Sequence, residues 1–138
     1  MEIAGNPVAH LRLASSATDG LAIVYLEDVA PDERVTYASQ GVLRLAFRKR
    51  AAGNGSAVSA DPFHTYLRAD MTPMVPGAFQ NVAIGLSPIA ALIRKGHRLR
   101  VAIAGADAGN LERLPATGDA TLTIARGSKT YLDVPHGR

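Results

Sequence analysis

The sequence predicts an all-β fold, an antiparallel β-sandwich with one short helix. Short segments in which apolar and polar residues alternate recur along the chain, and turn-forming residues separate them. One segment alone carries helix signals. No internal repeat or linker divides the 138 residues, a length that suits one domain with its own core. We therefore expect a single β-sandwich domain over residues 1–138.

The first two predicted strands differ in how they are covered. Residues 8–15, VAHLRLAS, place Ala9, Leu11 and Leu13 on one face and polar side chains on the other, which is typical of a half-buried strand. Residues 21–29, LAIVYLEDV, are apolar on both faces until Glu27, which favours a central strand. The APDERV stretch that follows predicts a β-turn containing Asp32.

Residues 41–49, GVLRLAFRK, show the clearest alternation. Leu43, Leu45 and Phe47 are predicted to point into the core, and Arg44 and Arg48 to point outward. The composition of residues 50–62, RAAGNGSAVSADP, predicts a long loop.

The second half of the chain continues the pattern. A turn at Pro76 and Gly77 precedes a strand with three aliphatic side chains on one face, and residues 98–105, RLRVAIAG, form the next strand. Two more strands are expected around Ile124 and over residues 129–135. The strand after Gly77 and the strand over residues 98–105 have these residues pointing inward: Val82, Ile84, Leu86, Leu99, Val101 and Ile103.

The predicted helix covers SPIAALIRKGH, residues 87–97. Ser87 can cap it, Pro88 suits the first helical position, Arg94 complements the carboxyl end, and Gly96 suits a left-handed stop. Little more than two turns are too short to be stable alone, so this helix should dock on a sheet.

Composition excludes several functions. The chain has no cysteine, which excludes disulfides, thiol catalysis and cysteine-ligated zinc. The pI is near 9.6, but 15 basic residues are offset by 12 acidic ones and aromatic residues are 5% of the chain, so neither nucleic acid nor a membrane is an expected partner. Without a recognisable signal peptide or any cysteine, a cytoplasmic location is favoured.

No residue pattern identifies a catalytic, cofactor or metal site. The serines lack the G-x-S-x-G setting of a nucleophile elbow, and the histidines lack metal-ligand spacing. The carboxylates between strands are interpreted as turn formers. None of these histidines and carboxylates is assigned a catalytic or ligand role. They are His10, His64, His97, His136, Asp28, Asp70, Asp107 and Asp119.

The outward-facing arginines leave two interpretations open. Arg44, Arg48, Arg98 and Arg100 could form a solvated face of the sheet. Alternatively, they could pair with the carboxylates of residues 28 or 107, or contact a neighbouring domain, where a bidentate guanidinium matters more than on a surface.

The ordered stretches YLEDVAPDERV, SQGVLRLAFRK, FHTYLRADMTPMVPGAFQNVAIGLSPIAALIRKGHRLRV and TYLDVPH resemble the C-terminal domain of X-Pro dipeptidyl-peptidases and of cocaine-esterase-like (CocE/NonD) serine hydrolases. The resemblance covers residues 5–135 and implies a jelly-roll β-sandwich of the galactose-binding-like kind. It also implies that Gly41 and Gly96 match positions of the family pattern, and that His97 and Arg98 bond nearby carbonyls or carboxylates. Departing from the family, APDERV lacks a turn glycine.

The resemblance implies a non-catalytic domain that packs on an α/β-hydrolase catalytic domain and helps shape its active-site entrance. The triad of such enzymes lies before the matched region, so no catalytic residue is carried over and no cofactor is expected. The alternative is a self-standing module that binds carbohydrate or another ligand. Few aromatic platforms are available for it, because Phe47 is expected in the core and the tyrosines are Tyr25, Tyr37, Tyr66 and Tyr131. An oligomer is compatible with either reading.

Overall fold

The computed structural model describes residues 1–52 and 61–137. Nine strands and two short 3-10 helices lie in this part of the chain. Their bounds are β1 Glu2–Gly5, β2 Val8–Ser15, β3 Leu21–Val29, β4 Val35–Arg44, η1 Leu45–Phe47, η2 Arg68–Asp70, β5 Gln80–Gly85, β6 Ile89–Leu92, β7 Arg98–Ala104, β8 Leu122–Ala125 and β9 Tyr131–Asp133. The expected all-β fold is confirmed.

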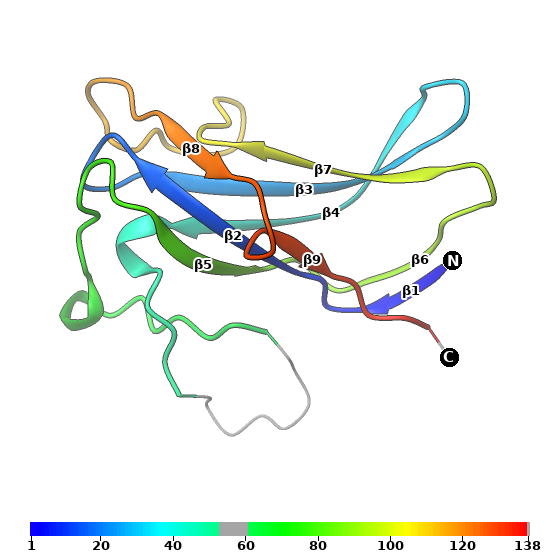
Figure 1. Cartoon of the computed structure of the whole chain (residues 1–138), viewed down its shortest axis with the longest axis horizontal. Helices are drawn as coiled ribbons and strands as arrows, with labels where there is room; N and C mark the ends of the chain where they lie inside the picture. The colour runs from blue at the N-terminus through cyan, green and yellow to red at the C-terminus, as the bar shows by residue number, and fades with distance from the viewer. Residues whose placement is uncertain (53–60, 138) are drawn as a thin grey trace.

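The strands form two facing sheets and a separate ribbon (Figure 1). One sheet has the order β5-β2-β8, and β9 pairs with the beginning of β2 on the same edge as β8. The other has the order β4-β3-β7, and β1 pairs with β6 to make the ribbon. Every pairing is antiparallel.

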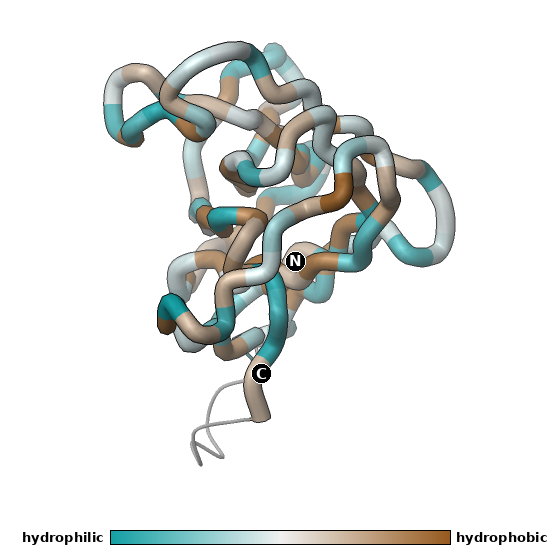
Figure 2. Tube along the Cα trace, turned by 90° about the vertical axis from the view of Figure 1, so that its left-hand side faces the viewer, coloured by the Kyte–Doolittle hydropathy of each residue, from teal (hydrophilic) through white to brown (hydrophobic). Residues whose placement is uncertain are grey.

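The core lies between the two sheets and has the faces that alternation predicts. Figure 2 shows hydrophobic and hydrophilic residues alternating along much of the chain. In β2, Leu11 and Leu13 are 3% and 0% exposed, and Leu11 lies opposite Val82 of β5. The buried cluster is completed by Ala9, Ala22, Val24, Leu26, Leu43, Leu45, Met74, Ile84 and Leu86. As predicted, β3 is the central strand of its sheet.

The short helix predicted over residues 87–97 is wrong. Residues Ile89–Leu92 form the strand β6, which pairs with β1 in a continuous register from Glu2 opposite Leu92 to Gly5 opposite Ile89. Ser87 caps nothing, and instead its N–H donates to Gln40 O at 2.9 Å. Two turns of helix are marginal, whereas the amino-terminal segment offers this apolar stretch a strand to pair with along its whole length.

Two smaller predictions also need correction. The strand expected over residues 41–49 ends at Arg44, and Leu45–Phe47 form the 3-10 helix η1. Leu45 is buried as predicted, but Phe47 is half-buried and outside the main core cluster. Val101 is 40% exposed because β7 is an edge strand of its sheet.

The predicted turns are confirmed. Asp32 accepts a hydrogen bond from Arg34 N at 3.2 Å, and Ala30 N donates to Arg34 O at 2.9 Å. Gly96 has a φ of 85°, the left-handed value expected of it, although it ends a turn and not a helix. Of the loop expected over residues 50–62, residues 53–60 lie outside the described part of the chain.

Candidate docking site

Exposed apolar side chains concentrate in one segment, residues 61–79, between η1 and β5. In Figure 1 this green segment wraps the end of the sandwich opposite the two termini. It holds six of the twelve large hydrophobic side chains that are exposed in the described part of the chain. We call these six residues the 61–79 patch: Phe63, Tyr66, Leu67, Met71, Val75 and Phe79.

The second half of this segment is tied to the sandwich by its backbone. Thr72 N donates to Ala46 O at 2.8 Å, and Met74 N donates to Thr18 O at 2.7 Å. Met74 turns inward and is 2% exposed, whereas Val75 next to it is 62% exposed. A chain anchored on one side must present its other side to the outside, so the exposure of Val75 follows from the anchoring.

The first half is held by a buried histidine. His64 is 8% exposed, and its two ring nitrogens lie 3.2 Å from Lys49 O and 3.0 Å from Ala83 O. Both partners are carbonyl oxygens, which accept from a ring N–H group. Phe63 O accepts from Ala51 N at 3.0 Å. His64 therefore fastens this part of the segment to β5 and leaves Phe63 pointing away from the core.

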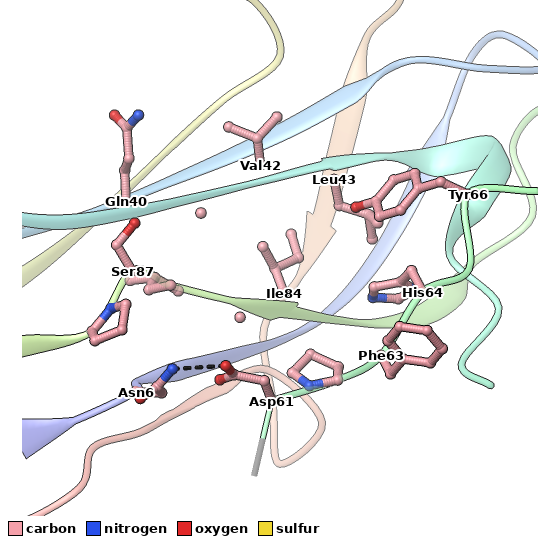
Figure 3. Close-up of a pocket in the computed structure, with 15 residues that line it drawn as sticks. Asn6, Gln40, Val42, Leu43, Asp61, Phe63, His64, Tyr66, Ile84 and Ser87 are labelled. Atoms are coloured by element: carbon pink, nitrogen blue, oxygen red, sulfur yellow. Dashed lines mark hydrogen bonds between the residues drawn. The ribbon is translucent and has the colours of Figure 1, made fainter. Parts of the chain in front are cut away.

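The patch continues into a cavity of about 570 Å³ at the edge of the sandwich. Figure 3 shows Phe63, His64 and Tyr66 on one side of it and Gln40 with Ser87 toward its other end. Parts of β4 and β5 also line the cavity. An aromatic wall facing amide and hydroxyl groups is the mixed lining common in binding sites.

Asn6 and Asp61 close the polar end of this cavity. Asn6 Nδ2 donates to Asp61 Oδ2 at 2.7 Å, as the dashed line in Figure 3 shows. This bond joins the chain before β2 to the beginning of the 61–79 segment.

Tyr66 has an unusual backbone for a large side chain, with a φ of 53°. The neighbouring anchors impose it: His64 is fixed on one side, and on the other Thr65 Oγ1 donates to Asp70 Oδ2 at 2.6 Å. The ring centre of Tyr66 lies 5.5 Å from that of Phe47. Although Tyr66 is 53% exposed, partial burial raises the pKa of its hydroxyl above its ordinary value. Strain at an aromatic residue marks a position that the surroundings specify.

The structure disperses the four histidines named from the sequence. His97 Nδ1 lies 2.9 Å from Asp28, which agrees with the expected carboxylate partner. His10 Nε2 lies 3.1 Å from Asp133, and its ring stacks on Tyr131 with the centres 4.4 Å apart. His64 is in the docking site, and the fourth histidine, in the carboxyl-terminal segment, is exposed.

The four arginines do form specific contacts, but not with residues 28 or 107. Three of them make ion pairs, and Arg48 donates to the carbonyl oxygens of Leu45 and Thr72 at 3.1 and 2.5 Å. The pairs are Arg44 with Asp19 at 2.7 Å, Arg98 with Glu33 at 2.5 Å and Arg100 with Glu27 at 2.6 Å. The ion-pair interpretation is therefore right in kind and wrong in its partners. The Arg98–Glu33 pair is largely exposed and contributes little to stability.

The four carboxylates named from the sequence all have partners, two of them distant in the sequence. Asp107 accepts from Gly109 N at 3.2 Å in a turn, as expected, and also from Tyr25, which the sequence did not indicate. Asp70 accepts from Thr65, and Asp119 forms an ion pair with Arg113. Asp28 is not the turn former that the sequence predicted, because it lies within β3 and bonds His97.

Within residues 1–52 and 61–137, no hydrogen bond joins a serine hydroxyl to a histidine. Ser39 Oγ donates to Ser87 O at 2.6 Å, and Ser128 lines a cavity together with His10 without bonding it. The same residues contain no cluster of histidine and carboxylate side chains that could hold a metal ion. Nor does this part of the chain contain a helix with the length and hydrophobicity needed to cross a membrane.

The fold and this site define the class of protein, an all-β sandwich that presents a rigidly held apolar surface. The family described as the X-Pro dipeptidyl-peptidase C-terminal non-catalytic domain matches residues 1–131. The chain belongs to this family, and the resemblance seen in the sequence is confirmed.

Two curated relatives are similar along nearly the whole chain. Proteins of Mycobacterium bovis and Mycobacterium tuberculosis, both named as serine esterases, are each 39% identical over 136 residues. These residues are 98% of this chain but 22% of each relative. The chain therefore spans about a fifth of the length of the esterases that it matches.

Solved structures show the same fold. A CocE/NonD family hydrolase from Staphylococcus aureus superposes with a TM-score of 0.80 at 16% identity, over 97% of this chain and 28% of the other. An aminopeptidase from a marine-sediment archaeon, Thaumarchaeota archaeon, superposes with a TM-score of 0.75 at 21% identity, over 96% of this chain and 23% of the other. At these identities the comparison supports the sandwich fold alone.

Proposed function

We propose that this sandwich is the non-catalytic domain of a serine hydrolase, packs through the 61–79 patch on the catalytic domain, and helps shape the active-site entrance. The observation that carries the proposal is the fixed exposure of Leu67 and Val75, 60% and 62%, on a segment whose backbone is anchored to the core. Exposed apolar side chains concentrated in one segment of a folded protein support an interaction site there.

The size of the relatives supports the choice of partner. Each named serine esterase has most of its length outside the region that this chain matches. Interfaces between domains of one chain typically bury about 600 to 1,500 Å². The patch and its adjoining cavity, with aromatic and aliphatic side chains and a few polar groups, suit such an interface.

The experiment compares the 138-residue chain with the complete protein encoded by its reading frame, using p-nitrophenyl esters as substrates. We expect serine-dependent turnover from the complete protein and none from the 138 residues. A G-x-S-x-G segment elsewhere in the frame would identify the nucleophile. Serine-dependent turnover by the purified 138-residue chain would overturn the proposal.

The interface is tested by placing a charge on it. Leu67→Asp and Val75→Asp in the complete protein should lower kcat/KM at least several-fold and expose the patch to hydrogen exchange, because a carboxylate cannot be buried against apolar side chains without a large cost. The matched control is Leu92→Asp, since Leu92 is similarly exposed, 67%, but lies on β6. Equal effects of all three variants would contradict the assignment of the patch.

The cavity itself favours the second candidate, a module that binds carbohydrate or another ligand. Phe63 and Tyr66 face Gln40, Ser87 and Asn6 across it, a combination of rings and amide groups that suits a sugar. A glycan array distinguishes the two candidates, because reproducible micromolar binding that Tyr66→Ala abolishes would support the module. Absence of binding would support the docking domain.

A further inference from the structure

A second cavity, of about 420 Å³, lies on the outer face of the sheet that contains β2. Its lining brings together Arg48 and Arg50, which follow η1, and Lys129, which lies in the turn between β8 and β9. No aspartate or glutamate lines it. We call it the cationic cavity. Three positive charges from two distant parts of the sequence converge there.

The two arginines have fixed positions along the backbone. The Arg48 guanidinium donates to the carbonyl oxygens of Leu45 and Thr72, which orient it without neutralising its charge. The residues on either side of Arg50 are also tied down, since Lys49 O lies 3.2 Å from His64 Nδ1 and Ala51 N donates to Phe63 O. The arginine side of the cavity is therefore built into the fold.

The turn that carries Lys129 is fixed in a similar way. Thr130 N donates to Gly127 O at 3.0 Å, and Thr130 Oγ1 donates to Ala125 O at 2.6 Å. The same hydroxyl accepts from Arg12 N of β2 at 3.1 Å. These bonds hold Lys129 beside β2.

Arg50 and Lys129 lack charge partners among the described residues. No hydrogen bond or ion pair within residues 1–52 and 61–137 involves either side chain. Two carboxylates lie in adjoining cavities that also contain Arg50. Asp133, whose Oδ2 bonds His10 Nε2, lines a cavity of about 460 Å³, and Asp70, which accepts from Thr65, lines one of about 230 Å³. Neither carboxylate bonds Arg50 or Lys129, so within the described residues no carboxylate pairs directly with these two cations.

The wall beside these cations is aromatic. His10 and Tyr131 stack with their planes 13° apart, and Tyr131 is 47% exposed. Ser128 adds a hydroxyl that can donate or accept. The lining therefore offers charged donors, a hydroxyl and a flat ring in one place.

We propose that the cationic cavity binds a small anion carrying phosphate or several carboxylate groups. Guanidinium and ammonium groups bond such oxygens more strongly than they bond neutral acceptors, and arginine does so in bidentate geometry. The volume lies in the range of small-molecule sites. An anion there would also relieve the repulsion among Arg48, Arg50 and Lys129. This proposal is independent of the docking function.

The test measures thermal unfolding of the 138-residue chain in inorganic phosphate, citrate and acetate at constant ionic strength set by sodium chloride. Phosphate or citrate at about 20 mM should raise Tm by about 5 °C if Kd is about 1 mM. Titration by NMR should shift the ring signals of Tyr131 and His10. A response to phosphate alone identifies phosphoryl chemistry, and a response to citrate alone identifies carboxylate chemistry.

Two double variants distinguish binding in the cationic cavity from a general effect of the positive charge of the protein. Arg50→Gln with Lys129→Gln should weaken binding at least tenfold. Arg94→Gln with Lys95→Gln also removes two positive charges, but from the turn before β7, and should leave binding unchanged. Either of two results would overturn the proposal: the two double variants weaken binding equally, or neither phosphate nor citrate stabilises the chain more than chloride does.

Discussion

The Tyr25 hydroxyl on β3 donates to Asp107 Oδ2 at 2.7 Å, which joins the middle of the sheet to the turn after β7. The same carboxyl group accepts from Asn110 Nδ2 at 3.0 Å. These contacts give the two residues opposite pKa shifts. The bonds from Asn110 and Tyr25 lower the pKa of Asp107, and the bond to Asp107 raises the pKa of Tyr25.

The pair therefore has a defined pH dependence. Its contribution to stability on the acid side is present above the ordinary pKa of a carboxyl group and is lost as pH falls through the lowered pKa of Asp107. On the alkaline side it is present below the ordinary pKa of tyrosine and is lost as pH rises through the raised pKa of Tyr25. The free energy of unfolding, measured in urea at acid and at alkaline pH, tests both losses of stability.

Removing the charge of Asp107 isolates its effect on the pKa of Tyr25. In Asp107→Asn we expect the pKa of Tyr25 to fall toward its ordinary value, as measured by the ultraviolet absorbance of tyrosinate. The raised pKa of Tyr66 should persist, because its cause is burial. Asp32→Asn, in the turn between β3 and β4, is the control and should leave both tyrosines unchanged. A Tyr25 titration unaffected by Asp107→Asn would contradict the assignment.

Gly41 is predicted to tolerate no side chain. A Cβ at this position would lie 2.3 Å from Gly85 O, because β4 and β5 approach each other closely there. Gly41→Ala should lower the free energy of unfolding by about 1 to 3 kcal/mol, since the two sheets must separate. In the control, Gly20→Ala, the nearest atom to the new Cβ is 3.6 Å away, and the change should stay below about 1 kcal/mol. Chemical denaturation decides, and similar losses for both variants would disprove the close-approach explanation.

His64 is predicted to be a structural residue of the docking site. His64→Leu removes the bonds to Lys49 O and Ala83 O and should lower the free energy of unfolding by about 1 to 3 kcal/mol. It should also increase hydrogen exchange across residues 61–66. His136→Leu is the control, because the side chain of His136 is exposed. A neutral effect of His64→Leu would show that the two contacts do not hold the segment.

The anchoring of residues 71–77 predicts opposite outcomes for two neighbours. Met74→Ala should lower the free energy of unfolding by about 2 to 5 kcal/mol, because Met74 is 2% exposed and belongs to the core cluster. Val75→Asp should change the stability of the 138-residue chain by less than about 0.5 kcal/mol, because Val75 is exposed. Thermal unfolding of the two variants checks both values. A large loss in Val75→Asp would mean that this residue faces the core.

Much of the fold could be predicted because strand alternation is a local property. The period of two in residues 8–15 identifies Leu11 and Leu13 as core residues without knowledge of their partners. The docking site could not be found in this way. It needs the segment around His64 to meet β5, and no local pattern specifies that meeting. The available signal in the sequence was the grouping of Phe63, Tyr66 and Phe79 within residues 61–79, a segment without strand alternation.

By itself, the sequence determined the all-β class, the faces of the main strands and the family, because these depend on residue type and spacing. The tertiary structure alone decided that residues 89–92 form a strand. Ser87, Pro88 and Gly96 are compatible with a helix, but a pairing with β1 involves residues more than eighty positions away. It also decided which charges meet, because ion pairs such as Arg100 with Glu27 depend on strand register. Long-range pairing supplies these partners, and local spacing carries no information about it.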